Sequence, residues 1–124
     1  MLRKALPFML LLASASGCAK HSVVQAGEPE TIEIRVSNNN VMDVTVYAVN
    51  QGMRVRLGTV STATTQRFRI ALHQVSPTGE LQLLADPVGS RRTVTSDVVH
   101  VFAGQALEWV LQADLQQSSL TIRS

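Results

Sequence analysis

The stretch Ile32-Glu33-Ile34-Arg35-Val36 indicates the fold of the chain most clearly, because apolar and charged side chains alternate in it at every position. A period of two is typical of a strand with one face buried and the other face in water. The same alternation recurs in Val44-Thr45-Val46-Tyr47-Ala48 and in Leu107-Glu108-Trp109. Val, Ile and Thr are frequent throughout, and these β-branched residues favour strands. The sequence therefore predicts an all-β domain.

About seven to eight short strands are expected, with turn-forming residues roughly every ten positions. Asn38-Asn39-Asn40, Asn50-Gln51-Gly52 and Ser76-Pro77-Thr78-Gly79 are such turns, and a short helical turn is expected over Leu72–Val75. Tight turns join antiparallel neighbours, so we predict an antiparallel two-sheet β-sandwich. The pattern resembles small immunoglobulin-like or transthyretin-like sandwiches. The side chains expected to face the core are Ile32, Ile34, Val36, Val44, Val46, Val55, Leu57, Phe68, Ile70, Leu83, Val99, Val101, Leu107, Trp109, Leu111 and Ile122.

The start of the chain has a different pattern. Arg3 and Lys4 precede the apolar run Ala5–Ala15, which is too short for a membrane-spanning helix, since that needs about 20 residues. A positive start, a short apolar run and small residues are typical of a secretory signal peptide.

Ala15-Ser16-Gly17-Cys18 resembles the lipobox of bacterial lipoproteins, although Ala15 stands where that family most often has Leu. The resemblance implies that signal peptidase II cuts between Gly17 and Cys18. It also implies that the thiol of Cys18 receives diacylglycerol and that the new amino group is usually acylated too. Two or more acyl chains hold a protein stably on a membrane. The alternative is an ordinary secretory signal peptide followed by an unrelated cysteine.

The lipobox also bears on location. Lipoproteins of this kind with Asp after the cysteine are often retained in the inner membrane, whereas here Ala19 and Lys20 follow. The resemblance therefore implies a cell-envelope protein on the outer membrane, facing the periplasm.

Three regions are expected: a signal peptide over 1–17, the lipidated cysteine with a flexible tether over 18–30, and the sandwich over 31–124. The tether lacks a sustained period and ends with Gly27 and Pro29, which favour loops. Val23-Val24 could instead begin an edge strand. The twelve residues after Cys18 reach at most about 40 Å when fully extended.

Short segments of the sandwich region also resemble parts of small bacterial lipoprotein β-sandwiches. These segments are Asp43-Val44-Thr45-Val46-Tyr47, Arg56-Leu57-Gly58-Thr59-Val60 and Leu83-Leu84-Ala85-Asp86-Pro87. The resemblance implies a fold and no activity.

The net charge argues against nucleic-acid binding. The chain has eleven Lys and Arg against nine Asp and Glu, which gives a formal charge of +2. Arg3 and Lys4 leave with the signal peptide, so the remaining side chains sum to zero. Nucleic-acid-binding domains are usually basic, and export argues in the same direction.

Four arginines are expected to point outward from two consecutive strands, because they alternate with apolar residues: Arg54, Arg56, Arg67 and Arg69. A hairpin around Ser61–Thr64 would place Arg56 near Arg69, and opposed like charges are destabilising. In that arrangement Tyr47 would stack on Arg56 from the preceding strand.

Two interpretations of these arginines remain open. In the first, Glu33 or Asp43 relieves the repulsion, the face is simply solvated, and the arginines prevent pairing at sheet edges. In the second, the arginines form a cationic face that binds an anionic partner, such as lipid head groups, an acidic glycan or an acidic protein surface.

The sequence predicts no catalytic residues, no metal and no cofactor. His21, His73 and His100 are far apart and lack zinc-ligand spacing. Ser96-Asp97 followed by His100 could serve a small hydrolase, but Ser and Asp are also common turn residues. Trp109 is expected in the core rather than in a ligand platform.

We therefore expect a membrane-anchored envelope lipoprotein that acts as a non-catalytic binding or assembly module. It would contact the membrane through acylated Cys18 and pair its edge strands with an envelope protein. The alternative is a cationic lipoprotein that recognises anionic envelope polymers or head groups through the outward arginines. The oligomeric state and the partner are not predicted.

Overall fold

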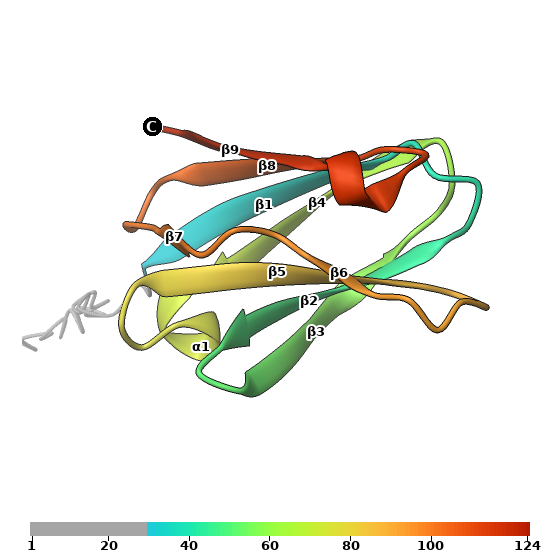
Figure 1. Ribbon diagram of the computed structural model, residues 1–124. Coiled ribbons are helices and arrows are strands. Elements are labelled where there is room, and N and C mark those ends of the chain that lie inside the picture. Colours follow the sequence, from blue (N-terminus) through green and yellow to red (C-terminus); the bar gives the residue numbers. More distant parts are fainter. Residues whose placement is uncertain (1–29) are drawn as a thin grey trace, which may run out of the picture.

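The computed structural model describes residues 30–124 (Figure 1). The predictions for the signal peptide, Gly17, Cys18, His21 and a strand at Val23-Val24 lie outside the described residues. Within the described part of the chain, no helix is long and apolar enough to cross a membrane.

The described residues form nine strands and two short helices. The strands are β1 (Thr31–Asn38), β2 (Val44–Asn50), β3 (Met53–Val60), β4 (Thr64–Ala71), β5 (Glu80–Pro87), β6 (Val94–Thr95), β7 (Val99–His100), β8 (Ala106–Leu111) and β9 (Ser119–Arg123). The predicted helical turn is confirmed as α1 (Leu72–Val75), and a 3-10 helix spans Leu115–Gln117. The strand count exceeds the prediction because β6 was not predicted, since its two residues are too few to show an alternation.

The strands form two packed sheets, which confirms the predicted β-sandwich (Figure 1). One sheet has the order β4-β1-β8-β9, and the other has the order β3-β2-β5-β6, with β7 also pairing β5. One pair departs from the expected antiparallel arrangement, since β1 and β8 run parallel. No tight turn connects these two strands, so nothing local forces them to run in opposite directions.

The predicted hairpin around Ser61–Thr64 is wrong. β3 pairs with β2 and β4 pairs with β1, so the connection crosses from one sheet to the other. Its polar groups bond to the end of β1 and to the β1–β2 connection instead of closing a hairpin. The Ala63 N–H donates to the Asn38 carbonyl at 2.8 Å, and the Thr62 N–H donates to Asp43 Oδ1 at 3.0 Å.

The core follows the alternation closely. Of the predicted core residues, eleven are buried: Ile32, Ile34, Val36, Val44, Val46, Phe68, Leu83, Val101, Leu107, Trp109 and Leu111. Val55, Leu57, Ile70 and Val99 are only partly buried and pack against this core. Ile122 was wrongly predicted as core, because it lies on the outermost strand β9 and is 37% exposed. The prediction missed the buried Ala48, Val60, Val75, Leu81, Leu84 and Ala85.

Two asparagines from a predicted turn are buried at the end of the sandwich where β1 ends. Asn38 donates from Nδ2 to the carbonyls of Met42 and Val60, at 2.9 and 3.0 Å. Its Oδ1 accepts from the Asn40 N–H at 2.9 Å. Asn40 in turn donates to the carbonyl of Ala113 at 3.0 Å. The bond to Val60 joins Asn38 of β1 in one sheet to β3 in the other, and so ties the two layers together.

Candidate anion-binding site

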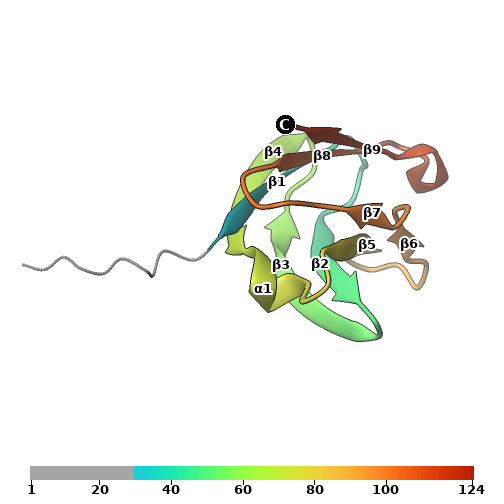
Figure 2. The same ribbon diagram turned by 90° about the vertical axis from the view of Figure 1, so that its left-hand side faces the viewer.

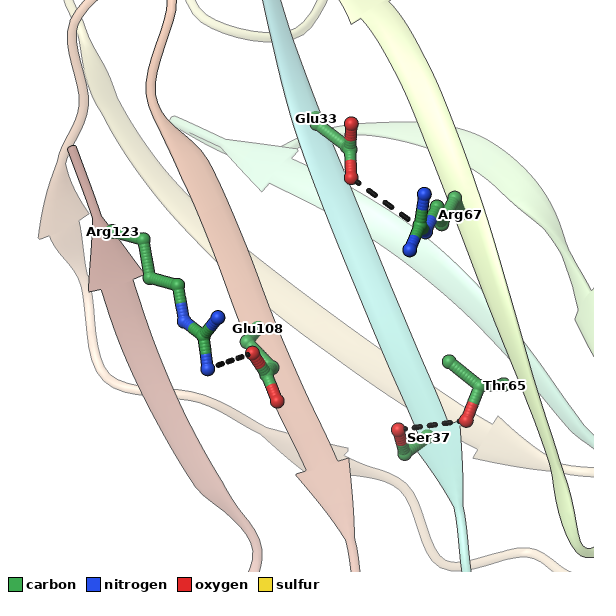
Figure 3. Close-up of polar contacts among 6 residues, drawn as sticks. All are labelled: Glu33, Ser37, Thr65, Arg67, Glu108 and Arg123. Atoms are coloured by element: carbon green, nitrogen blue, oxygen red, sulfur yellow. Dashed lines mark hydrogen bonds and ion pairs between the residues drawn. The ribbon is translucent and has the colours of Figure 1, made fainter.

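The outer face of the β4-β1-β8-β9 sheet gathers four arginines from three strands. Because alternate residues of a strand share a face, the buried side chains of β1, β4 and β8 direct their neighbours outward. We call Arg35, Arg67, Arg69 and Arg123 the arginine face; Glu33 and Glu108 lie among them. Figure 3 shows Arg67, Glu33, Glu108 and Arg123 on adjacent strands of this sheet.

Both glutamates of this face already have partners. Arg67 Nε lies 3.9 Å from Glu33 Oε1, and Arg123 Nη2 lies 2.8 Å from Glu108 Oε2 (Figure 3). Glu33 thus contacts Arg67, but the repulsion between Arg56 and Arg69 that it was expected to relieve does not arise, because β3 and β4 belong to different sheets. Asp43, the other residue considered for this role, accepts a hydrogen bond from Thr62.

Of the four arginines, Arg35 and Arg69 have no ion pair within the described residues. Arg35 lies opposite Arg67 in the ladder with β4 and level with Glu108 in the ladder with β8. Within residues 30–124 it forms no ion pair, and its Nε is buried without a hydrogen-bond partner. A buried unpaired donor of this kind is costly. Because Arg35 has no ion pair and lies between the paired residues, the centre of the face has an excess of positive charge.

A groove of about 290 Å³ lies over this centre. Among the residues that line it are Glu33, Arg35, Arg67, Glu108 and Arg123. Planar guanidinium groups bind carboxylate and phosphate oxygens through paired hydrogen bonds. The groove can thus hold one acidic group between Arg35 and its neighbouring arginines.

Hydroxyl groups extend this polar strip along the sheet. Ser37 on β1 and Thr65 on β4 share a hydrogen bond between their side-chain oxygens at 2.9 Å (Figure 3). They follow Arg35 and precede Arg67 on the same outward register. A polymer lying along β1 would meet cationic groups first and neutral hydroxyls next.

The four predicted arginines do not form one face, which corrects the sequence-based expectation. Arg67 and Arg69 lie on β4, whereas Arg54 and Arg56 lie on β3 of the other sheet. Arg56 is therefore not a cross-strand neighbour of Arg69. β3 and β4 are edge strands of their sheets, and charged residues at such positions deter pairing with other chains. Protection of the edges is one reason for charged residues on β3 and β4, but it does not apply to Arg35 on the interior strand β1.

Tyr47 stacks with a different arginine from the one expected. It lies level with Arg56 in the ladder, but the guanidinium carbon of Arg54 lies over its ring, 5.3 Å from the centroid. A register shift between Val46 and Tyr47 interrupts the ladder at this point. Arg56 turns toward Thr59 instead, and donates from Nη2 to its Oγ1 at 3.1 Å.

The hydroxyl of Ser96 serves the fold. Ser96 Oγ accepts from the Leu83 N–H at 2.9 Å and donates to the Asp97 carbonyl at 2.8 Å. These bonds attach the segment around β6 to β5. His100 instead contacts Phe102, with ring centroids 4.8 Å apart. His73 and His100 do line one pocket, yet across residues 30–124 no group of three or more His, Cys, Asp or Glu could hold a metal ion.

Sequence reasoning missed the roles of Arg35, Glu108 and Arg123. Their alternation with Ile34, Leu107 and Ile122 indicated that they face outward. Their proximity depends on the β1–β8 and β8–β9 pairings, for which no local signal exists. Trp109 lies in the core as predicted, with 1% of its surface exposed.

No protein-family model matches this chain, and a search of curated proteins also finds no match.

Proposed function

We propose that this chain is a membrane-anchored lipoprotein of the cell envelope that acts as a non-catalytic binding module. In this proposal the arginine face holds acidic groups of an anionic envelope polymer. Acylated Cys18 anchors the protein to the outer membrane, on the periplasmic side.

The lipid anchor is supported by the sequence. Cys18 is the only cysteine of the chain, and it directly follows a positive start, a short apolar run and the small residues Ser16 and Gly17. Two or more acyl chains on that residue would make attachment stable. A binding module attached in this way can collect a polymer next to the membrane.

The position of Arg35 is the observation that carries the binding site. It lies on an interior strand, faces Arg67 across the ladder and has no ion pair within the described residues. Two arginines held opposite each other repel. An acidic group in the groove would convert that repulsion into two favourable contacts.

The edge strands support face binding better than strand pairing. An envelope protein could add a strand to the free edge of β3 or β4, but these edges carry Arg54, Arg56, Arg67 and Arg69. Such residues oppose edge pairing. The edge of β9 is short, with five residues.

The test compares two double variants of the mature lipoprotein, extracted from membranes in mild detergent. Binding to an acidic polysaccharide is measured at low and at physiological salt. Arg67→Gln with Arg69→Gln should weaken binding by about tenfold at low salt, because charge-assisted hydrogen bonds are lost.

Arg54→Gln with Arg56→Gln is the matched control, since it removes the same charge from the outer face of the other sheet. It should change affinity by less than about threefold, as expected for charges remote from the bound groups. Equal weakening by both pairs would indicate attraction to net charge alone and would contradict the proposed site. An affinity that is unchanged by all four replacements would also contradict the proposed site.

A further inference from the structure

Figure 2 shows end-on the end of the sandwich where β1 starts, where α1 lies and where the loop between β7 and β8 lies. Exposed apolar side chains lie at this end. Phe102, in the loop between β7 and β8, is 60% exposed, and Met53, at the start of β3, is 71% exposed. We call this surface the apolar end. The register places the two residues at the same end, because β7 pairs with the start of β5 and Met53 pairs with Asn50 at the end of β2.

The chain joins the sandwich at this same end. The Glu30 carbonyl accepts from the Leu72 N–H at 2.8 Å, and the Thr31 carbonyl accepts from the Gly104 N–H at 2.8 Å. These bonds fix the start of β1 between α1 and the loop that carries Phe102. If residues before Glu30 attach the protein to a membrane, the apolar end is therefore the end held toward that membrane.

Phe102 is held in its exposed position by its own loop. Its N–H donates to Gln105 Oε1 at 2.9 Å, and its carbonyl accepts from the Gln105 N–H at 3.1 Å. The edge-to-face contact with His100, at an interplanar angle of 65°, restrains the ring further. A restrained aromatic side chain loses little conformational freedom when it enters an apolar environment.

We propose that the apolar end rests on the bilayer surface, with Phe102 and Met53 in contact with lipid. This inference rests on the proposed lipid attachment at Cys18. The twelve residues between Cys18 and the start of β1 reach at most about 40 Å, so they keep this end close to the membrane. The tether raises the effective concentration of the apolar end at the membrane, and this favours its docking. Phe, Trp and Leu are typical of the apolar faces of protein segments that lie in the membrane interface.

The charges of this end favour apolar docking over attraction to anionic head groups. Three acidic and three basic side chains lie near this end of their strands, namely Glu30, Glu33, Glu80, Arg54, Arg69 and Arg123, so their charges cancel. His73 and His100 also lie there. The contact should therefore persist in salt that releases a polymer from the arginine face.

Tryptophans introduced one at a time report the contact between the apolar end and lipid. Phe102→Trp, Met53→Trp and Val41→Trp variants of the full lipoprotein are reconstituted into phosphatidylcholine vesicles whose acyl chains carry bromine, a quencher. Val41 is the matched control, since it is 83% exposed and lies at the opposite end, between β1 and β2. Trp109 is 1% exposed and contributes equally to all three.

The Phe102→Trp and Met53→Trp variants should be quenched at least about twofold more than Val41→Trp, in low and in high salt, because interfacial aromatic residues meet the acyl chains. Flotation with the vesicles but equal quenching of all three would overturn the docking and leave the lipid anchor standing. Failure of the protein to float with the vesicles would contradict the anchor and the docking that rests on it.

Discussion

Arg35 and Arg67 lie directly opposite each other where β1 pairs with β4, two like charges on adjacent strands of one sheet. Opposed like charges destabilise a strand pair. Glu33 approaches Arg67 only to 3.9 Å, and the side chain of Arg67 is 62% exposed and that of Glu33 42%. The fold therefore keeps an arrangement that does little for its stability, and the proposed function assigns these residues to binding.

Arg67→Gln should accordingly separate stability from binding. The substitution removes the repulsion with Arg35 and a weak exposed ion pair, so the free energy of unfolding should change by no more than about 0.5 kcal/mol. Urea unfolding followed by the emission of the buried Trp109 measures this. A loss above about 1 kcal/mol would mean that Arg67 has a structural role.

Asn38→Ala should destabilise the fold strongly. The side chain is fully buried and makes three hydrogen bonds, to the Met42 and Val60 carbonyls and from the Asn40 N–H. Removing it leaves buried backbone groups unpaired, at a cost of about 2 to 4 kcal/mol in the free energy of unfolding. Denaturant midpoints of the two proteins provide the measurement.

Asn39→Ala is the control for that substitution, because Asn39 is the exposed residue between the two buried asparagines. Its replacement should change the free energy of unfolding by less than about 0.5 kcal/mol. Similar costs at positions 38 and 39 would show that the buried hydrogen bonds do not hold this end of the sandwich.

The sequence predicted which way side chains point better than which strands meet. Ile34 and Arg35 alternate, so their faces follow from the period of two. Arg54 and Arg67 were also correctly expected to point outward, but they lie on different sheets. Their separation depends on the bonds from the Ser61–Ala63 connection to Asn38 and Asp43, which are long-range contacts with no local pattern.

The same distinction applies to the candidate site. Glu108 and Arg123 form their ion pair only because β8 pairs with both β1 and β9. Periodicity identifies a strand and its faces but not the strand with which it pairs. Glu33 was anticipated as an acidic neighbour of the arginines, and its contact with Arg67 follows from the β1–β4 pairing.

Gly58→Ala should destabilise the contact between the two sheets at β3. A Cβ at this position would lie 2.8 Å from Phe68 Cε1, closer than two carbons tolerate. Displacing the Phe68 ring from the core should lower the free energy of unfolding by about 1 to 3 kcal/mol. Urea unfolding again measures the effect.

A Phe68→Leu background tests whether that cost arises from the ring. Leu lacks the atoms that the new Cβ would meet, so Gly58→Ala should cost at least about 1 kcal/mol less in this background. An equal cost in both backgrounds would place the cause in the backbone at Gly58 and contradict the steric account.

Intact mass spectrometry of the native protein from membranes tests the central claim, that Cys18 anchors this domain to lipid. We expect a chain that begins at Cys18 and carries the added mass of diacylglycerol and, on the amino group, a further acyl chain. A soluble product with an unmodified cysteine thiol, or with a different first residue, would contradict the account.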